Sequence, residues 1–137
     1  MSAIKPEEIT QLVSEAWGVS PEAMAAACGK HARAPVRQFA DPAYAARICA
    51  IMLIRRHTTA SYHTATRAVG REDHHSDYVE KQVDYFRRYA MRRPEIAFCI
   101  ERIEQQIDEI HEARVEKCAA IPGRSLTAFV QSSSLCA

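Results

Sequence analysis

The hydrophobic positions along the chain recur at helical intervals, and no stretch alternates for long enough to predict a strand. Pro6 and the acids after it open a first predicted helix, whose apolar stripe reaches Trp17 before Gly18 ends it. Ser20-Pro21-Glu22 repeats this start signal and predicts a second, shorter helix that runs to about Cys28. Continued to the end of the chain, the pattern predicts an all-α fold of about six helices.

A basic connection leads from these helices into the most hydrophobic part of the chain. Between residues 30 and 40 we predict a loop, because Pro35 interrupts any helix there. The basic side chains of this segment are Lys30, His31, Arg33 and Arg37. Asp41-Pro42 then caps a helix that is predicted to be largely buried and to end in Arg55-Arg56-His57. Its apolar positions, which make it the candidate central core helix, are Tyr44, Ile48, Ile51, Met52 and Leu53.

Two helices joined by a tight turn are predicted next. The segment 58–61 offers several caps for a short helix, and Val69-Gly70 is predicted to form the turn. Asp73 is predicted to cap a longer helix over about residues 73–91, whose first turn is polar. The inward positions predicted for the two helices are Tyr62, Ala65 and Ala68, then Tyr78, Val79, Gln82, Val83, Tyr85 and Phe86. This spacing fits a helix-turn-helix, and it fits equally well two helices that simply pack in a core.

The last predicted helix begins at Pro94 and carries a seam of isoleucines. Ile96, Ile100, Ile103, Ile107 and Ile110 recur with the steps of a heptad pattern, but the seam is short, since Arg114 and Lys117 take its next positions. The sequence leaves open whether this seam docks on the rest of the domain or forms a homodimer through residues 96–110. We therefore divide the chain into a domain over 1–93, an amphipathic docking or dimerisation helix over 94–121, and a flexible Ser/Ala-rich tail over 122–137.

Length and composition fit one soluble domain. The 137 residues are 47% hydrophobic and 26% charged, which excludes a wholly disordered or fibrous chain. No apolar stretch approaches the roughly 18 residues that cross a bilayer, and residues 1–11 mix charge among their apolar positions instead of forming a signal peptide. The five cysteines are odd in number and lack a repeated spacing, which favours reduced thiols in a cytoplasm.

Charge is distributed unevenly along the chain, although the net charge is only +1. Residues 29–93 hold 13 Lys or Arg against six Asp or Glu, whereas residues 1–28 and 94–137 are each acidic. Such a basic middle region favours a polyanionic partner. Nucleic acid is the commonest polyanion for a cytoplasmic protein, but a charge count does not separate it from an acidic protein or a membrane surface.

No combination of residues indicates catalysis or a metal site. No cysteine has a convincing histidine and acid partner, so nucleophilic catalysis is not expected. His74 and His75, with Asp73 and Asp77, lack the second paired element that a structural zinc site needs. We therefore expect neither an enzyme nor a bound metal, cofactor or nucleotide.

Three stretches of the middle region stand in the order and spacing of a known DNA-binding domain. They are Arg47-Ile48-Cys49-Ala50-Ile51-Met52-Leu53, then Thr58 with Ser61-Tyr62, then Gly70-Arg71-Glu72-Asp73-His74-His75-Ser76. Over roughly residues 8–86 the chain thus resembles the C-terminal domain of the bacterial replication initiator DnaA. The resemblance implies a helix-turn-helix of the DnaA C-terminal or Trp-repressor kind. It does not extend to the family's ATPase module, since no Gly-rich phosphate loop with Lys-Ser/Thr occurs here.

The resemblance also implies roles for individual residues. The residues expected to contact bases in the major groove are Asp73, His74, His75 and Ser76. Those expected at the DNA backbone or in the minor groove are Lys30, Arg33, Arg37, Arg55, Arg56, Thr58, Ser61, Arg67, Arg71 and Lys81. Glu72 departs from the family signature, because it separates Arg71 from Asp73 and adds an acid beside the phosphates. The departure predicts another target sequence or weaker binding than the family's nine-base-pair box.

These expectations describe a sequence-specific binder of double-stranded DNA that regulates transcription or replication. Its expected location is the bacterial cytoplasm, at the nucleoid. The alternative is a protein–protein adaptor in which a degenerate helix-turn-helix no longer contacts DNA and the isoleucine seam binds a partner helix. Glu72 and the acidic ends of the chain support that alternative.

Overall fold

The computed structural model describes residues 3–27, 35–72 and 76–119, and every regular element in those ranges is helical. The predicted all-α class is therefore confirmed. The elements are α1 (Pro6–Trp17), α2 (Pro21–Ala26), the 3-10 helix η1 (Pro35–Ala40), α3 (Pro42–His57), α4 (Tyr62–Ala68), α5 (Ser76–Met91) and α6 (Pro94–Ala119).

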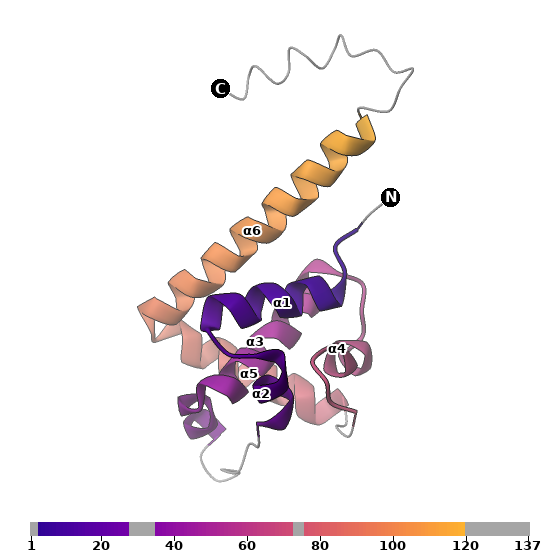
Figure 1. Cartoon of the computed structure of the whole chain (residues 1–137). Coiled ribbons are helices and arrows are strands. Elements are labelled where there is room, and N and C mark those ends of the chain that lie inside the picture. The colour runs from indigo at the N-terminus through magenta and orange to yellow at the C-terminus, as the bar shows by residue number, and fades with distance from the viewer. Residues whose placement is uncertain (1–2, 28–34, 73–75, 120–137) are drawn as a thin grey trace.

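Helix α3 is the centre of the fold, as its sequence predicts. Every residue from Tyr44 to Ile54 is buried, so this helix has no solvent-facing stripe over three turns. It packs against α1, α2, η1, α4 and α5, which surround it (Figure 1). Asp41 caps it by accepting a hydrogen bond from the Ala43 amide at 3.0 Å, and Pro42 occupies the first turn.

The ends of α1 follow the local signals in the sequence. Pro6 begins the helix, and the Glu8 carboxylate accepts a hydrogen bond from the Lys5 amide at 2.8 Å. Gly18 ends the helix with a φ of 68°, a left-handed conformation that favours glycine. Ile9 and Val13 are fully buried, so the predicted apolar stripe faces the core.

The predicted loop over residues 30–40 is wrong for its second half. Residues 35–40 form the 3-10 helix η1, which Pro35 begins, and a proline is tolerated there because the first amide of a helix has no intrahelical partner. Phe39 explains why the segment is ordered. Its ring is buried and stacks on Tyr44 at 5.6 Å between centroids, and it meets Phe86 edge-on at 5.4 Å. Residues 30–34 lie outside the described part of the chain.

Helix α2 ends earlier than the sequence predicts. It stops at Ala26, and Ala27 is extended with a ψ of 139°. Arg47, only 3% exposed, is the physical reason, because its guanidinium donates to the carbonyl oxygens of Met24, Ala25 and Ala27. The Arg47 guanidinium thus satisfies carbonyl groups at the C-terminal end of α2.

Helix α6 docks on the body of the molecule through the predicted isoleucine seam. Ile103 and Ile107 are fully buried and Ile100 is 9% exposed, all within the core that includes α1 and α3. In Figure 1, α6 runs alongside α1 and its C-terminal end extends past the body. Of the two interpretations that the sequence left open for this seam, docking is the contact that the structure contains. A homodimer through residues 96–110 stays a prediction.

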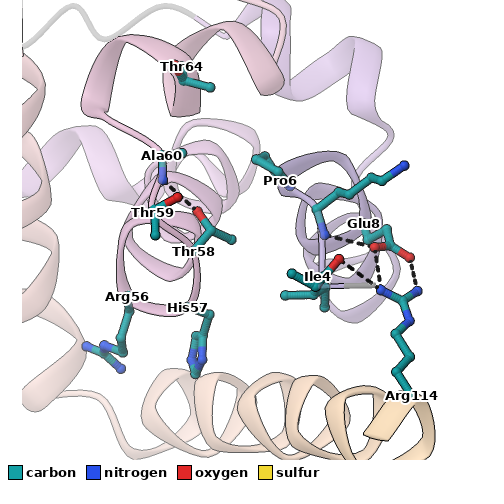
Figure 2. A pocket seen from close by; sticks show the side chains of 12 residues that line it. Ile4, Pro6, Glu8, Arg56, His57, Thr58, Thr59, Ala60, Thr64 and Arg114 are labelled. Carbon is teal, nitrogen blue, oxygen red and sulfur yellow. Dashed lines mark hydrogen bonds and ion pairs between the residues drawn. The ribbon is translucent and has the colours of Figure 1, made fainter. Parts of the chain in front are cut away.

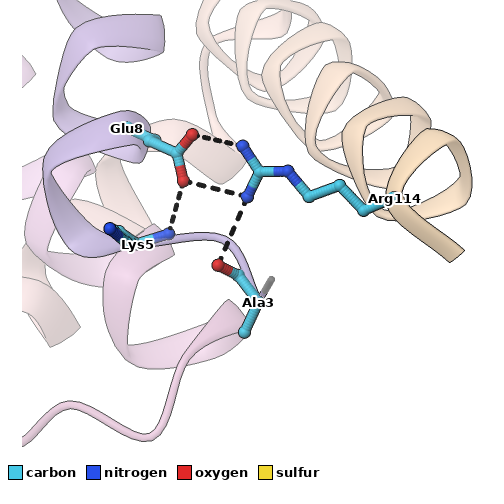
Figure 3. A network of polar contacts seen from close by, with 4 residues as sticks. All are labelled: Ala3, Lys5, Glu8 and Arg114. Atoms are coloured by element: carbon cyan, nitrogen blue, oxygen red, sulfur yellow. Dashed lines mark hydrogen bonds and ion pairs between the residues drawn. The ribbon is translucent and has the colours of Figure 1, made fainter. Parts of the chain in front are cut away.

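An ion pair fixes α6 to the start of α1. The Arg114 guanidinium forms a forked contact with the two carboxylate oxygens of Glu8 and also donates to the Ala3 carbonyl oxygen at 3.2 Å (Figure 3). The hydrogen bond from Arg114, followed by that from the Lys5 amide, lowers the pKa of Glu8 to about 2. The carboxylate therefore stays charged at any pH near neutrality.

Candidate nucleic-acid interface

Helix α4 ends in a tight turn at Gly70, where the sequence predicts one. Ser61 caps α4 by accepting a hydrogen bond from the Thr64 amide at 3.2 Å. Gly70 forms the turn with a φ of 89°, and the Arg71 amide closes it by donating to the Thr66 carbonyl oxygen at 3.0 Å.

Helix α2 packs directly against this turn through Ala25. A Cβ added to Gly70 would lie 2.8 Å from the Ala25 Cβ, closer than two carbon atoms approach without strain. Arg71 donates to the Ala25 carbonyl oxygen at 3.0 Å. The guanidinium that the sequence assigned to a DNA phosphate is thus engaged in holding the turn on α2.

The described start of α5 faces outward. Ser76 and Asp77 are exposed, and Tyr78 is 42% exposed. The prediction of an inward Tyr78 is wrong, because the buried stripe of α5 begins one residue later, at Val79. Figure 1 shows α6 packed on the other side of the molecule, beside α1, so it does not cover this end of α5. Three of the four predicted base-contacting residues, Asp73, His74 and His75, lie outside the described residues.

Among the described residues, five of the predicted backbone-contacting cations are exposed: Arg37, Arg55, Arg56, Arg67 and Lys81. Arg37 lies on η1, Arg67 in the last turn of α4, and Lys81 in the second turn of α5. They stand on the elements that carry or flank the predicted helix-turn-helix, where cationic side chains would meet phosphates. Lys30 and Arg33 fall outside the described ranges.

Two of the residues predicted to contact phosphates, Arg55 and Thr58, form hydrogen bonds within the protein. Arg55 donates to the Ala60 carbonyl oxygen at 2.8 Å and stacks on the Tyr62 ring, 4.3 Å from its centroid. The Thr58 hydroxyl donates to the Ile54 carbonyl oxygen at 2.7 Å and accepts from the Ala60 amide. These contacts shape the connection between α3 and α4, so their substitution would change the fold of that connection as well as any contact with DNA.

Glu104 on α6 pairs with the C-terminal end of α3. Arg56 Nη1 and His57 Nε2 both lie 2.8 Å from the same carboxylate oxygen of Glu104. Burial opposes the charged form of this carboxylate, but the hydrogen bonds from Arg56 and His57 outweigh it and lower the pKa of Glu104. Arg56, a predicted phosphate contact, thus already has an acidic partner from α6.

A cleft of about 1180 Å³ lies next to this pair, between the N-terminal segment, the α3–α4 connection and α6 (Figure 2). Its lining includes the basic side chains of Lys5, Arg56 and Arg114, with Thr58, Thr59 and Thr64 supplying hydroxyl groups. Both arginines are paired with glutamates, Glu104 and Glu8. Two of the three basic side chains in the lining are therefore already paired with acids.

A buried polar cluster joins three elements and was not expected from the sequence. The Gln82 side-chain oxygen on α5 accepts a hydrogen bond from the Tyr44 hydroxyl of α3 at 2.7 Å. It accepts a second one from the side-chain amide nitrogen of Gln38, on η1, at 3.1 Å. Burial, followed by the neighbouring Tyr78, raises the pKa of Tyr44, so its hydroxyl remains a donor. Gln82 was predicted to face inward, and a polar side chain within an apolar stripe was the one signal of this cluster in the sequence.

The described residues show no group of three or more side chains suited to a metal ion. Cys49 is buried, and burial raises the pKa of its thiol, as it does for the partly exposed Cys99. Neither cysteine is a reactive thiolate at neutral pH. Within the same part of the chain, no helix has both the length and the apolar character needed to cross a membrane.

Comparison with known proteins gives no match, because no family profile, curated protein or solved structure aligns significantly with this chain. The resemblance to the DnaA C-terminal domain therefore rests on the three sequence stretches quoted for it.

Proposed function

We propose that this protein binds double-stranded DNA sequence-specifically through α4, the Gly70 turn and α5. The observation that carries the proposal is the outward-facing start of α5 behind a turn that α2 holds in place. In a helix-turn-helix, the first residues of the second helix enter the major groove, and the first helix crosses the backbone.

In this proposal the charges and the polar side chains have separate tasks. Arg37, Arg67 and Lys81 would neutralise phosphates and so supply the salt-dependent, sequence-independent part of the binding free energy. Residues 73–76 would contact base edges, where Asp accepts from cytosine N4 and Ser bonds to a base or a phosphate. Arg55 and Arg71 would shape the interface from inside, through their contacts with Ala60 and Ala25.

A DNA-binding domain of this kind would occupy a site without opening it. The proposed role is therefore regulation of transcription, or competition for sequences at a replication origin, in the bacterial cytoplasm at the nucleoid. No nucleotide or cofactor enters this role.

The test is a salt titration of DNA binding with the full chain, using duplexes selected from a random pool and scrambled duplexes of equal composition. Lys81→Ala is expected to weaken binding to both duplexes alike and to reduce the log–log salt slope by about one unit. His74→Ala is expected to weaken binding to the selected duplex by about 1–3 kcal/mol, with little change on the scrambled one. Lys117→Ala, which removes an exposed charge from the far end of α6, is the matched control and should change neither.

Equal, salt-insensitive effects of Lys81→Ala and His74→Ala would refute this division of tasks. A chain that retains no duplex at about 0.1 M salt, where a competent binder is still held, would refute the proposed function itself. That result would favour the protein–protein adaptor. The observation that supports the adaptor is that acidic residues lie beside several of the basic ones. Glu104 pairs with Arg56, and the acids Asp77 and Glu80 precede Lys81 on α5.

A further inference from the structure

The inward face of α5 is apolar except at one position. Val79, Val83, Phe86 and Ala90 are buried, and so is Gln82, which is 5% exposed. A buried amide without partners would cost free energy, and here the Gln82 oxygen accepts two hydrogen bonds, from Tyr44 and Gln38. Apolar side chains of similar volume would fill such a site at equal or lower cost in stability. Overall stability alone therefore does not account for this polar cluster.

The cluster joins two elements that the proposed function places on DNA, η1 and α5, to the central helix α3. Gln38 follows the exposed Arg37 on η1, and Gln82 lies one helical turn after Tyr78 in the first turn of α5. Tyr44 in the first turn of α3 stands between them and contacts Tyr78 as well as Gln82. The hydrogen bonds thus connect the basic segment and the start of α5 to the central helix.

Aromatic contacts and one hydrogen bond beside the cluster also hold η1 on α5. Phe39 packs against Phe86 and lies 5.3 Å from Tyr89 between ring centroids, and the Tyr89 hydroxyl donates to the Phe39 carbonyl oxygen at 3.3 Å. Ring packing tolerates small rotations and slides, whereas hydrogen bonds require defined distances and angles. Tyr89 bonds α5 to η1 at one point, and the shared oxygen of Gln82, two turns earlier on the same helix, supplies the second point that defines the rotation of α5 about its axis relative to η1.

We propose that Gln82, with Tyr44 and Gln38, is a positioning residue that aligns the start of α5 with the basic η1 segment and thereby determines how well the protein discriminates between DNA sequences. This inference rests on the proposed function. It goes further in assigning sequence discrimination to a buried cluster that touches no DNA. Base contacts require placement to within a fraction of an ångström, whereas phosphate contacts tolerate more displacement.

The test replaces the cluster by apolar side chains in the full chain, as Gln38→Leu, Tyr44→Phe and Gln82→Leu together. This variant is expected to unfold at the same temperature as the wild type or above it, because the donors and the acceptor of the cluster are removed together. Its affinity for the scrambled duplex should change less than about twofold, while the ratio of affinities for selected and scrambled duplexes should fall by at least about tenfold. Tyr44→Phe alone is the milder variant and should lower the same ratio by a smaller factor. Thr10→Val removes a buried hydroxyl that bonds only within α1, and it should leave the ratio unchanged.

A second measurement does not depend on DNA. Residual dipolar couplings of the α5 amides, compared with those of α3, should differ between wild type and the triple variant if the cluster sets the orientation of α5. Couplings that agree with those of the wild type, or an unchanged affinity ratio, would overturn the inference. If the wild type itself binds no duplex, the proposed function fails. The couplings then still decide whether the cluster positions α5.

Discussion

Gly70 is the residue on which the shape of the turn after α4 depends most directly, and Gly70→Ala tests this. Two costs add at this position. A φ of 89° is left-handed, which costs an alanine about 1–2 kcal/mol. The new Cβ would also lie 2.8 Å from the Ala25 Cβ, well inside the roughly 3.5–4.0 Å of an unstrained carbon contact. Overpacking of this kind costs about 1–3 kcal/mol, so we expect a total loss of about 2–5 kcal/mol.

Gly18 provides the matched control within the same chain. Its φ of 68° is also left-handed, but a Cβ added there would meet no atom within 4 Å. Gly18→Ala should therefore lose only the conformational part, about 1–2 kcal/mol. For a domain of this size, thermal unfolding should show a fall of about 3–5 °C for each kcal/mol lost, so the two variants are readily separated.

A double-mutant cycle isolates the contact with α2. Ala25→Gly alone costs about 1 kcal/mol, because glycine is a poor residue within a helix. In that background, Gly70→Ala should cost about 1–3 kcal/mol less than it does in the wild type, since the Cβ that it meets is gone. Equal losses for Gly70→Ala and Gly18→Ala, or strictly additive losses in the cycle, would refute the claim that the turn rests on α2.

Three further predictions concern charged groups. Arg47→Met should lower the free energy of unfolding, measured by urea denaturation, by about 2–4 kcal/mol, because it leaves carbonyl groups of α2 without their donor. A loss below about 1 kcal/mol would contradict this role. The folded-state pKa of Glu8 is about 2, below its ordinary value of 4.5. Its contact with Arg114 therefore stabilises the fold fully above pH 4.5, and this contribution is lost as the pH falls from 4.5 through 2. In Glu8→Gln that part of the acid dependence of unfolding should vanish, and an NMR titration of the Glu8 carboxyl with a midpoint near 4.5 would disprove the assignment. Glu104→Gln should strengthen binding to any duplex and steepen the salt slope by up to about one unit, because Arg56 loses the carboxylate charge that it pairs with. An unchanged slope would show that Arg56 faces no phosphate.

The parts of the fold that were predictable are those encoded within a few residues. Pro6, Gly18 and Asp41 mark helix ends by their own conformational or capping preferences, and each stands where the sequence places it. Ser61 is the one of the several caps offered over residues 58–61 that begins α4. The burial of α3 follows from its unbroken apolar run. These signals require no knowledge of distant partners.

The missed features depend on residues far apart in the chain. Helix η1 is stabilised by Phe39 against α3 and α5, and α2 ends early because Arg47 lies 20 residues beyond Ala27. The pairing of Arg56 with Glu104 spans 48 residues. At the candidate site, the sequence correctly placed Lys81 and Arg67 on the surface. It did not reveal that Arg56 is already paired, because a list of basic residues does not show which of them meet acids in the fold.

The complete burial of α3 has a consequence for how this chain tolerates changes in length. Adding or removing one residue within Tyr44–Ile54 would turn the rest of that helix by about 100°. In a peripheral helix such a turn displaces one packed face, but α3 is packed on every side, so five neighbouring elements would lose their register together. Insertions and deletions in relatives of this chain should therefore avoid α3 and gather where α6 extends past the body.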